Sequence, residues 1–223
     1  MQVSKDMLPE HDSVIEGSEL LDPPGAGLPW LELVVIRSVF GVLRALLRKE
    51  QIDAWFLAEQ YKILVLVDEV EFNHGSRRVL ISRVTGIEDS SRNWSVFMTL
   101  EHLNIVNRAI ANIVTALSKN LPIAQEVSVA EVKPAVEEHD EICKKEAAVF
   151  AKEKVEKFAS TCGFYRSALH RVNLSFLKFE GGSSPTHQHP WFGSLNAHEW
   201  HLLAAVHMRI HRQQISRILH QLK

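Results

Sequence analysis

Apolar residues recur at steps of three and four along most of the chain, which predicts an all-α protein. The helices are expected at 28–49, 51–69, 93–119, 135–161, and from Asn196 toward the C-terminus. Asn196 followed by Glu199 resembles a capping box, which would begin the last helix. We therefore expect one helical domain over 28–223, preceded by a flexible or draped tail at 1–27.

The helix at 93–119 carries the clearest pattern. Its apolar positions define one face, and they are Leu103, Val106, Ile110, Ile113 and Leu117. The helix at 135–161 is instead the most charged, with acid-first pairs at i,i+4 such as Glu153 and Lys157. We interpret that charge run as a solvated face.

Three connections interrupt the helices. Two glycines and clustered Ser and Asp indicate an extended segment at 72–91. The stretch 125–134 alternates loosely and ends in a proline, so it is expected to be a short strand or an extended crossing segment. A loop rich in Gly, Ser, Pro and His follows at 180–194.

Composition excludes several function classes. The 223 residues include 25 basic and 27 acidic side chains, and this formal charge of -2 offers no broad positive field for nucleic acid. The apolar run from Leu28 to Leu47 contains three charges, which predicts a core helix and no membrane span. The two cysteines form no CxxC motif, and the tail lacks a secretory pattern, so a reducing, cytoplasmic setting is expected.

Histidines gather on the last helix. At 100° per residue, His207 and His211 lie on its apolar stripe, and Gln214 joins them. His201 lies about 120° and His198 about 180° from His207, so both are expected to point toward solvent or a loop.

A third histidine completes a candidate metal site. His102 lies on the apolar face of the helix at 93–119. Imidazoles at i and i+4 can converge on one ion, and a third from a facing helix makes a tripod with an open position. Zinc, nickel, cobalt or iron would suit the site. The alternative is that these are hydrogen-bonded core histidines, because HxxxH also arises by chance.

Other polar residues are given ordinary structural roles. Glu101 is expected to be exposed, and Arg77, Arg78 and Arg83 are expected to be solvated at the surface. In the HPWFG sequence, the proline and glycine would set a turn while Trp191 and Phe192 anchor it, although His187 and His189 lie near enough in sequence to approach a metal. Nothing near Cys143 or Cys162 indicates a reactive thiol.

Three motifs in order resemble the DinB-like (DinB/YfiT-like) superfamily: SRNWSVFMTLEHLNIV, HPWFGSLNAHEW and HMRIHRQQI. The resemblance covers roughly Arg83 to Ile215 and implies a four-helix bundle. It also implies a divalent metal held by His102, His207 and His211. Relatives look like metal-dependent transferases that act with a low-molecular-weight thiol, or like hydrolases. The extended N-terminal segment and the long connections depart from the compact plan, so a substrate does not carry over.

Three classes of function remain open on the sequence. The first is a metal-dependent enzyme that activates water or a low-molecular-weight thiol to attack a small-molecule substrate. The second is a module that binds a metal or small ligand without chemistry, because no carboxylate base accompanies the tripod. The third is a structural or interaction protein whose histidines fill the core. Any of them allows a homodimer through the apolar surface at Leu31 to Leu47.

Overall fold

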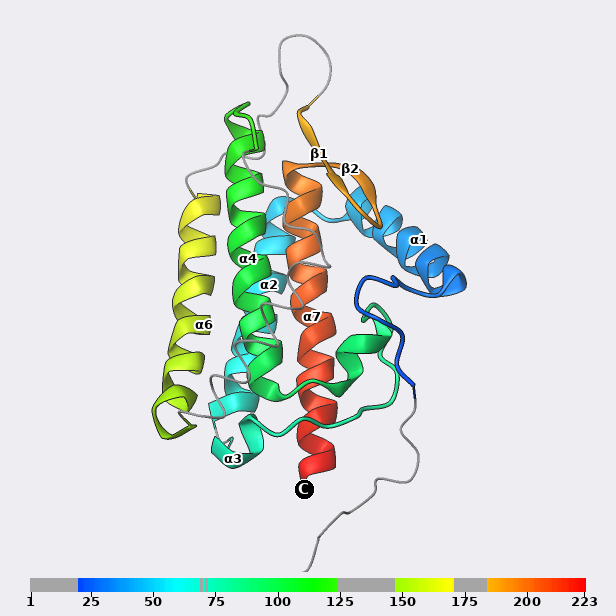
Figure 1. Cartoon of the computed structure of the whole chain (residues 1–223). Helices are drawn as coiled ribbons and strands as arrows, with labels where there is room; N and C mark the ends of the chain where they lie inside the picture. The colour runs from blue at the N-terminus through cyan, green and yellow to red at the C-terminus, as the bar shows by residue number, and fades with distance from the viewer. Residues whose placement is uncertain (1–19, 69, 71, 124–146, 171–183) are drawn as a thin grey trace, which may run out of the picture.

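The computed structural model describes residues 20–68, 70, 72–123, 147–170 and 184–223. It is mostly helical, as the sequence predicts. Four long helices run side by side (Figure 1), and they are α2 (Lys49–Asp68), α4 (Val96–Ser118), α6 (Ala147–His170) and α7 (Ala197–Leu222). Helix α4 packs against α6 and α7, and α2 closes the ring by contacting the same two helices. The hydrophobic core lies inside this ring.

Shorter elements surround the four long helices. They are α1 (Trp30–Leu46), α3 (Phe72–Gly75), the 3-10 helix η1 (Asp89–Asn93), and the antiparallel strands β1 (Thr186–His189) and β2 (Gly193–Asn196). The predicted helices at 28–49, 51–69 and 93–119 are thus confirmed as α1, α2 and α4. None of the described helices is both long enough and apolar enough to cross a lipid bilayer.

Helix α6 ends later than the sequence predicted. The residues 135–146 of the expected helix, and the expected strand at 125–134, lie outside the described residues. Beyond position 161 the helix continues to His170. The buried residues Phe158, Cys162 and Tyr165 explain this, because their spacing of four and three extends one apolar face past the predicted end.

Side-chain caps fix where α4 and α7 begin. The Ser95 hydroxyl accepts a hydrogen bond from the Met98 amide at 3.1 Å. At α7 the predicted capping box is confirmed: Asn196 Oδ1 accepts from the Glu199 amide at 3.0 Å, and the Glu199 carboxylate accepts from the Asn196 amide at 2.9 Å. These caps set the starting points from which every histidine of the two helices is placed.

Helix α1 is not the core helix that its composition predicted. Figure 1 shows it projecting at an angle from the side of the four long helices. Within α1 only Phe40 is buried. Leu43 and the following Leu47 pack against the core on the same side, while most other large apolar residues of the helix face outward. A hydrophobic helix can be partly exposed in this way because hydropathy does not reveal how many neighbours cover it.

The expected loop before α7 contains a β-hairpin. His189 pairs with Gly193, and Gly193 adopts a φ of +73°, a left-handed conformation that suits glycine. The ring of Phe192 lies 4.6 Å from that of Phe40, centroid to centroid. The predicted turn and its aromatic anchor are therefore confirmed, whereas the short strands went unseen because they lack an apolar alternation.

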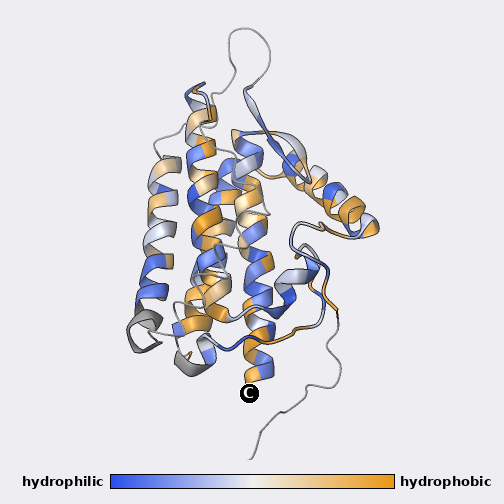
Figure 2. Ribbon diagram, in the orientation of Figure 1, coloured by the Kyte–Doolittle hydropathy of each residue, from blue (hydrophilic) through white to orange (hydrophobic). Residues whose placement is uncertain are grey.

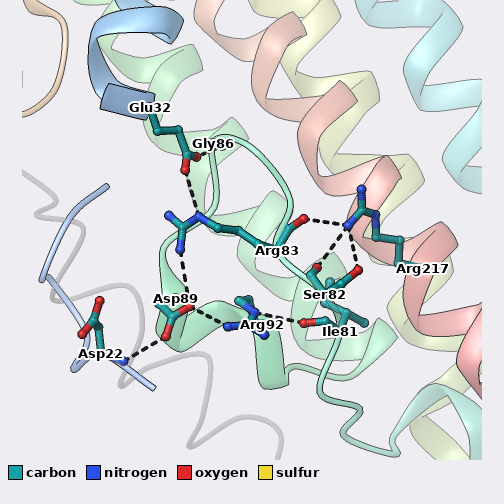
Figure 3. A network of polar contacts seen from close by, with 9 residues as sticks. All are labelled: Asp22, Glu32, Ile81, Ser82, Arg83, Gly86, Asp89, Arg92 and Arg217. Atoms are coloured by element: carbon teal, nitrogen blue, oxygen red, sulfur yellow. Dashed lines mark hydrogen bonds and ion pairs between the residues drawn. The ribbon is translucent and has the colours of Figure 1, made fainter. Parts of the chain in front are cut away.

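The extended segment after α3 is held by charged contacts, drawn in Figure 3. Arg83 binds Glu32 of α1 at 2.9 Å and Asp89 at 3.4 Å, so it is not the solvated surface group that we expected. Asp89 also binds Arg92 at 2.8 Å and accepts a hydrogen bond from the backbone amide of Asp22. This network fixes the segment to α1 and to the tail, and thereby fixes the position of η1.

The charged surface of α6 is only partly solvated. Lys154 is 2% exposed and lies 3.2 Å from Glu101 of α4, which also binds Lys157 at 2.8 Å. Glu101 is therefore buried, and our expectation that it is exposed was wrong. Burial lowers the pKa of Lys154 to about 8 although Glu101 acts in the opposite direction. These ion pairs therefore join α4 to α6.

We expect Glu101→Gln to destabilise the protein. The substitution leaves Lys154 buried without a counter-charge, so the free energy of unfolding should fall by about 3 kcal/mol in urea denaturation. Glu153→Gln is the matched control, because Glu153 is an exposed acid on α6. Its effect should stay below about 0.5 kcal/mol. Equal effects of the two substitutions would show that the buried pair contributes no more than a surface charge.

Candidate metal centre

Three imidazoles meet where α4 packs against α7. His102 comes from α4, and His207 and His211 come from successive turns of α7. One ring nitrogen from each residue lies within 4.8 Å of those of the other two. The Nε2 atoms of His102 and His207 are 3.0 Å apart. The prediction that these side chains face one another is confirmed, and they lie close enough together to hold a metal ion.

The spacing of the nitrogens matches a metal tripod. Around a tetrahedral zinc ion with bonds of 2.0–2.1 Å, two neighbouring nitrogens are about 3.3 Å apart. The separation of 3.0 Å between the two Nε2 atoms is close to this value. A small outward movement of the rings would therefore admit an ion.

Burial keeps all three imidazoles neutral. It pushes the pKa of His102 and of His207 well below the usual value, and a charge on His211 would act in the same direction. It lowers the pKa of His211 to about 4, against the opposing effect of a hydrogen bond to Gln214. Each ring therefore keeps a free lone pair at neutral pH, which is the form that binds a metal.

The proton on His211 is placed by a chain of hydrogen bonds. The Ser91 carbonyl can only accept, so the Gln214 Nε2 at 2.8 Å must donate to it. That orientation directs Gln214 Oε1 at the His211 Nδ1, 2.7 Å away, which therefore carries the proton. The Nε2 of His211 keeps the lone pair. Our prediction that Gln214 orients a histidine agrees with this geometry, and Ser91 had no sequence signal.

Two ring nitrogens of the histidine cluster have no hydrogen-bond partner among the described residues. The Nδ1 atoms of His102 and His207 are buried, and no hydrogen-bond partner for them exists in the described part of the chain. A hydrogen bond between the two Nε2 atoms would pair those nitrogens and would leave the Nδ1 atoms of both residues unpaired. Core histidines normally pair both ring nitrogens, because an unpaired buried polar atom costs free energy. An ion on the three Nε2 atoms would occupy the lone pairs that face one another, and the two Nδ1 atoms would stay unpaired with or without it.

A large cavity borders the three histidines. Its volume is about 1210 Å³, above the usual range for a site that holds one small molecule. Its wall is mainly apolar and includes Phe40 of α1, Ile113 of α4 and Trp200 of α7. The segment at 85–88 forms another part of the wall. An ion on the three histidines would be reached through an apolar chamber.

The hairpin brings two more histidines to the same cavity. His187 and His189 both line it. The His189 Nδ1 accepts a hydrogen bond from the Trp191 amide at 3.0 Å, so a neutral ring carries its proton on Nε2. Burial lowers the pKa of His189 to about 4, and a charge on this ring would lower the pKa of His207 further. His189 is thus a neutral hydrogen-bond donor on the cavity wall.

His201 contradicts our expectation that it points to solvent. It is 0% exposed, and its Nε2 lies 2.7 Å from the Asp53 carboxylate while its Nδ1 lies 2.9 Å from the Tyr165 hydroxyl. The carboxylate can only accept, so Nε2 donates to it and Nδ1 accepts from the tyrosine. Burial raises the pKa of Asp53, but its bonds to His201 and Lys49 prevail and lower it to about 2.

This second cluster joins α2, α6 and α7 and does not border the cavity. Sequence reasoning missed it because it limited the apolar stripe of α7 to the side of His207, although Met208 and Ile215 lie beside His201 and are buried as well. Cys162 is also buried, and burial raises the pKa of its thiol to about 12. It is therefore no nucleophile, as predicted; Cys143 lies outside the described residues.

No family model, no curated protein and no solved structure matches the chain. The likeness of its motifs to the DinB-like superfamily thus stays an expectation from the residues quoted above. What the protein does must be inferred from the three imidazoles and from the cavity beside them.

Proposed function

We propose that the protein is a metal-dependent enzyme of the DinB-like type, which uses a divalent ion on His102, His207 and His211 to transform a small molecule. The observation that carries this proposal is the convergence of three neutral imidazoles, two buried and His207 half-buried, on the wall of a large apolar cavity. They are presented by α4 and α7, and the four long helices agree with the bundle that the resemblance implies.

Each residue of the centre has a distinct role. The three Nε2 atoms hold the ion, and Gln214 with the Ser91 carbonyl keeps His211 in the metal-binding tautomer. A divalent ion with an open position lowers the pKa of a bound water or thiol and polarises an electrophile. His189 lies on the hairpin side of the cavity, where its Nε2 proton can be donated to a bound molecule, and the wall beside the ion is mainly apolar.

The cavity favours an apolar or aromatic substrate. Its wall presents few charged groups, and among them Arg37 is engaged with the Trp191 carbonyl. A low-molecular-weight thiol or water would supply the nucleophile, because the buried Cys162 cannot. In the cytoplasm, where we place the protein from its cysteine usage, such thiols are reduced and abundant. Zinc, nickel and iron are the metals expected.

A second candidate function is the binding of a metal or small ligand without chemistry. Glu88 is the carboxylate that borders the cavity among the described residues. It is buried, and its Oε2 accepts a hydrogen bond from the Gly25 amide at 3.0 Å. A carboxylate held in this way is poorly placed to serve as a general base. This observation favours a binding role over catalysis.

We expect tag-free protein to bind about one divalent ion per chain, measured by elemental mass spectrometry after incubation with zinc, nickel or iron. His207→Ala should lose most of that metal while keeping its helical circular dichroism. His220→Ala is the matched control, because His220 is an exposed histidine on the same helix. Metal-free parent protein under every condition would refute the metal centre and the enzyme with it.

Gln214→Leu should weaken zinc binding by about 10- to 100-fold, because it frees the tautomer of His211. A titration against a competing chelator measures the change. Gln221→Leu, an exposed position near the end of α7, should leave the affinity unaltered. An unchanged affinity in Gln214→Leu would mean that the ring is oriented by packing alone.

Turnover separates the two candidate functions. Metal-loaded protein should convert members of a panel of aromatic esters and electrophiles, with and without added thiols, and His207→Ala should reduce the rate at least about 100-fold. His220→Ala should retain it. Tight binding of panel members without product would favour the non-catalytic alternative. Full activity in His207→Ala would show that the centre is not the site of reaction.

A further inference from the structure

The outer face of α1 is an unexplained apolar surface. Seven of its large side chains are more than half exposed: Trp30, Leu31, Val34, Val35, Val39, Val42 and Leu46. Figure 2 shows hydrophobic residues along this projecting helix. Together they present apolar surface on the order of 500 Å², near the upper end for a monomer. A helix that is hydrophobic all round is normally buried on every side.

The charges of α1 all contact other parts of the protein, and the Arg44 side chain remains half-exposed. Glu32 binds Arg83 at 2.9 Å and the Gly86 amide at 2.6 Å, as Figure 3 shows in part. Arg37 donates to the Trp191 carbonyl, and Arg44 binds Glu199 at 3.1 Å. The outward stripe is consequently without charge. A helix that lies on a membrane surface usually presents a strongly charged face to the headgroups, which this arrangement does not provide.

The outward stripe has the same spacing in both directions, and the same residue types except at its centre. Its members lie within about 100° of arc at 100° per residue, and they are Leu31, Val35, Ser38, Val39, Val42 and Leu46. A two-fold axis between Ser38 and Val39 would place Leu31 opposite Leu46. It would also place Val35 opposite Val42. A two-fold interface must be self-complementary, and this stripe is so in spacing and, apart from Ser38 opposite Val39, in residue type.

We propose that two copies of the chain pair through α1, with the two helices antiparallel about that axis. The contact would run about 22 Å along the helix at 1.5 Å per residue. Its area is at the small end for a specific interface, so we expect a weak and reversible dimer. The pairing does not depend on a metal.

The dimer would also complete the cavity. Val35 and Val39 line the cavity and are more than half exposed, so the chamber is open along α1. A second copy seated on this helix covers that opening with its own apolar stripe. The partner therefore contributes part of the wall that separates the three histidines from solvent.

Charged substitutions at Val35 and Val42 test the antiparallel register of the two α1 helices. In sedimentation of the full chain, the parent should be a dimer at tens of micromolar and dissociate on dilution. The double variant Val35→Lys, Val42→Lys places like charges opposite one another and should weaken the dimer at least about 100-fold. The double variant Val35→Glu, Val42→Lys places opposite charges there and should still dimerise. Circular dichroism and thermal unfolding check that both variants are folded.

Five outcomes would overturn the proposal. If the parent stays monomeric at all concentrations, α1 does not form an interface. If both double variants dimerise as strongly as the parent, the interface lies elsewhere. Loss of dimer in the opposite-charge variant as well would refute the antiparallel register. Binding of the parent to phosphatidylcholine and phosphatidylserine vesicles, lost in both variants and without self-association, would assign the face to a membrane. Dimerisation that appears only after residues 1–19 are deleted would assign it to the tail.

Discussion

The packing of α4 against α7 is the contact on which the candidate site depends. It buries the apolar faces of both helices and brings His102 against His207 and His211 in the same layer. Trp94, which precedes α4, lies against the rings of His102 and His211. Because the three imidazoles are dry, they are neutral, and because they are neutral they can bind a cation. A core that merely needed filling would use aliphatic residues, which lose nothing on desolvation.

Buried polar contacts fix how the other helices sit around that pair. Glu101 with Lys154 joins α4 to α6, Glu59 with Arg212 joins α2 to α7, and the His201 cluster adds a contact between α6 and α7. Such contacts stabilise little on average, because desolvation offsets much of the attraction. These contacts do oppose a shift of one helix along another, because a shift would leave a buried charge without its partner. The geometry of the histidines is thereby held by groups that never touch the cavity.

The added parts of the chain surround the chamber. The segment at 85–91 supplies both a wall of the cavity and the Ser91 carbonyl that orients Gln214, while α1 and the hairpin cover the remaining sides. The φ of +92° at Gly86 lets the segment turn close to α7, where a side chain would meet Ile210. Together with α4 and α7, these elements form the wall of the cavity.

The sequence by itself determined the long helices α2, α4 and α7, the capping box at Asn196 and the three candidate ligands. Periodicity at 100° per residue is a local property, so it correctly placed His207, His211 and Gln214 on one face of α7 and His102 on the facing side of α4. Periodicity could not show what packs against the other faces of these helices. His201 is buried because Tyr165 and Asp53 come from two other helices, and Glu101 is buried because α6 covers it. Only the tertiary structure decides which polar side chains are buried, how far α1 is covered and where the cavity lies. The reason is that all three depend on contacts between residues far apart in the chain.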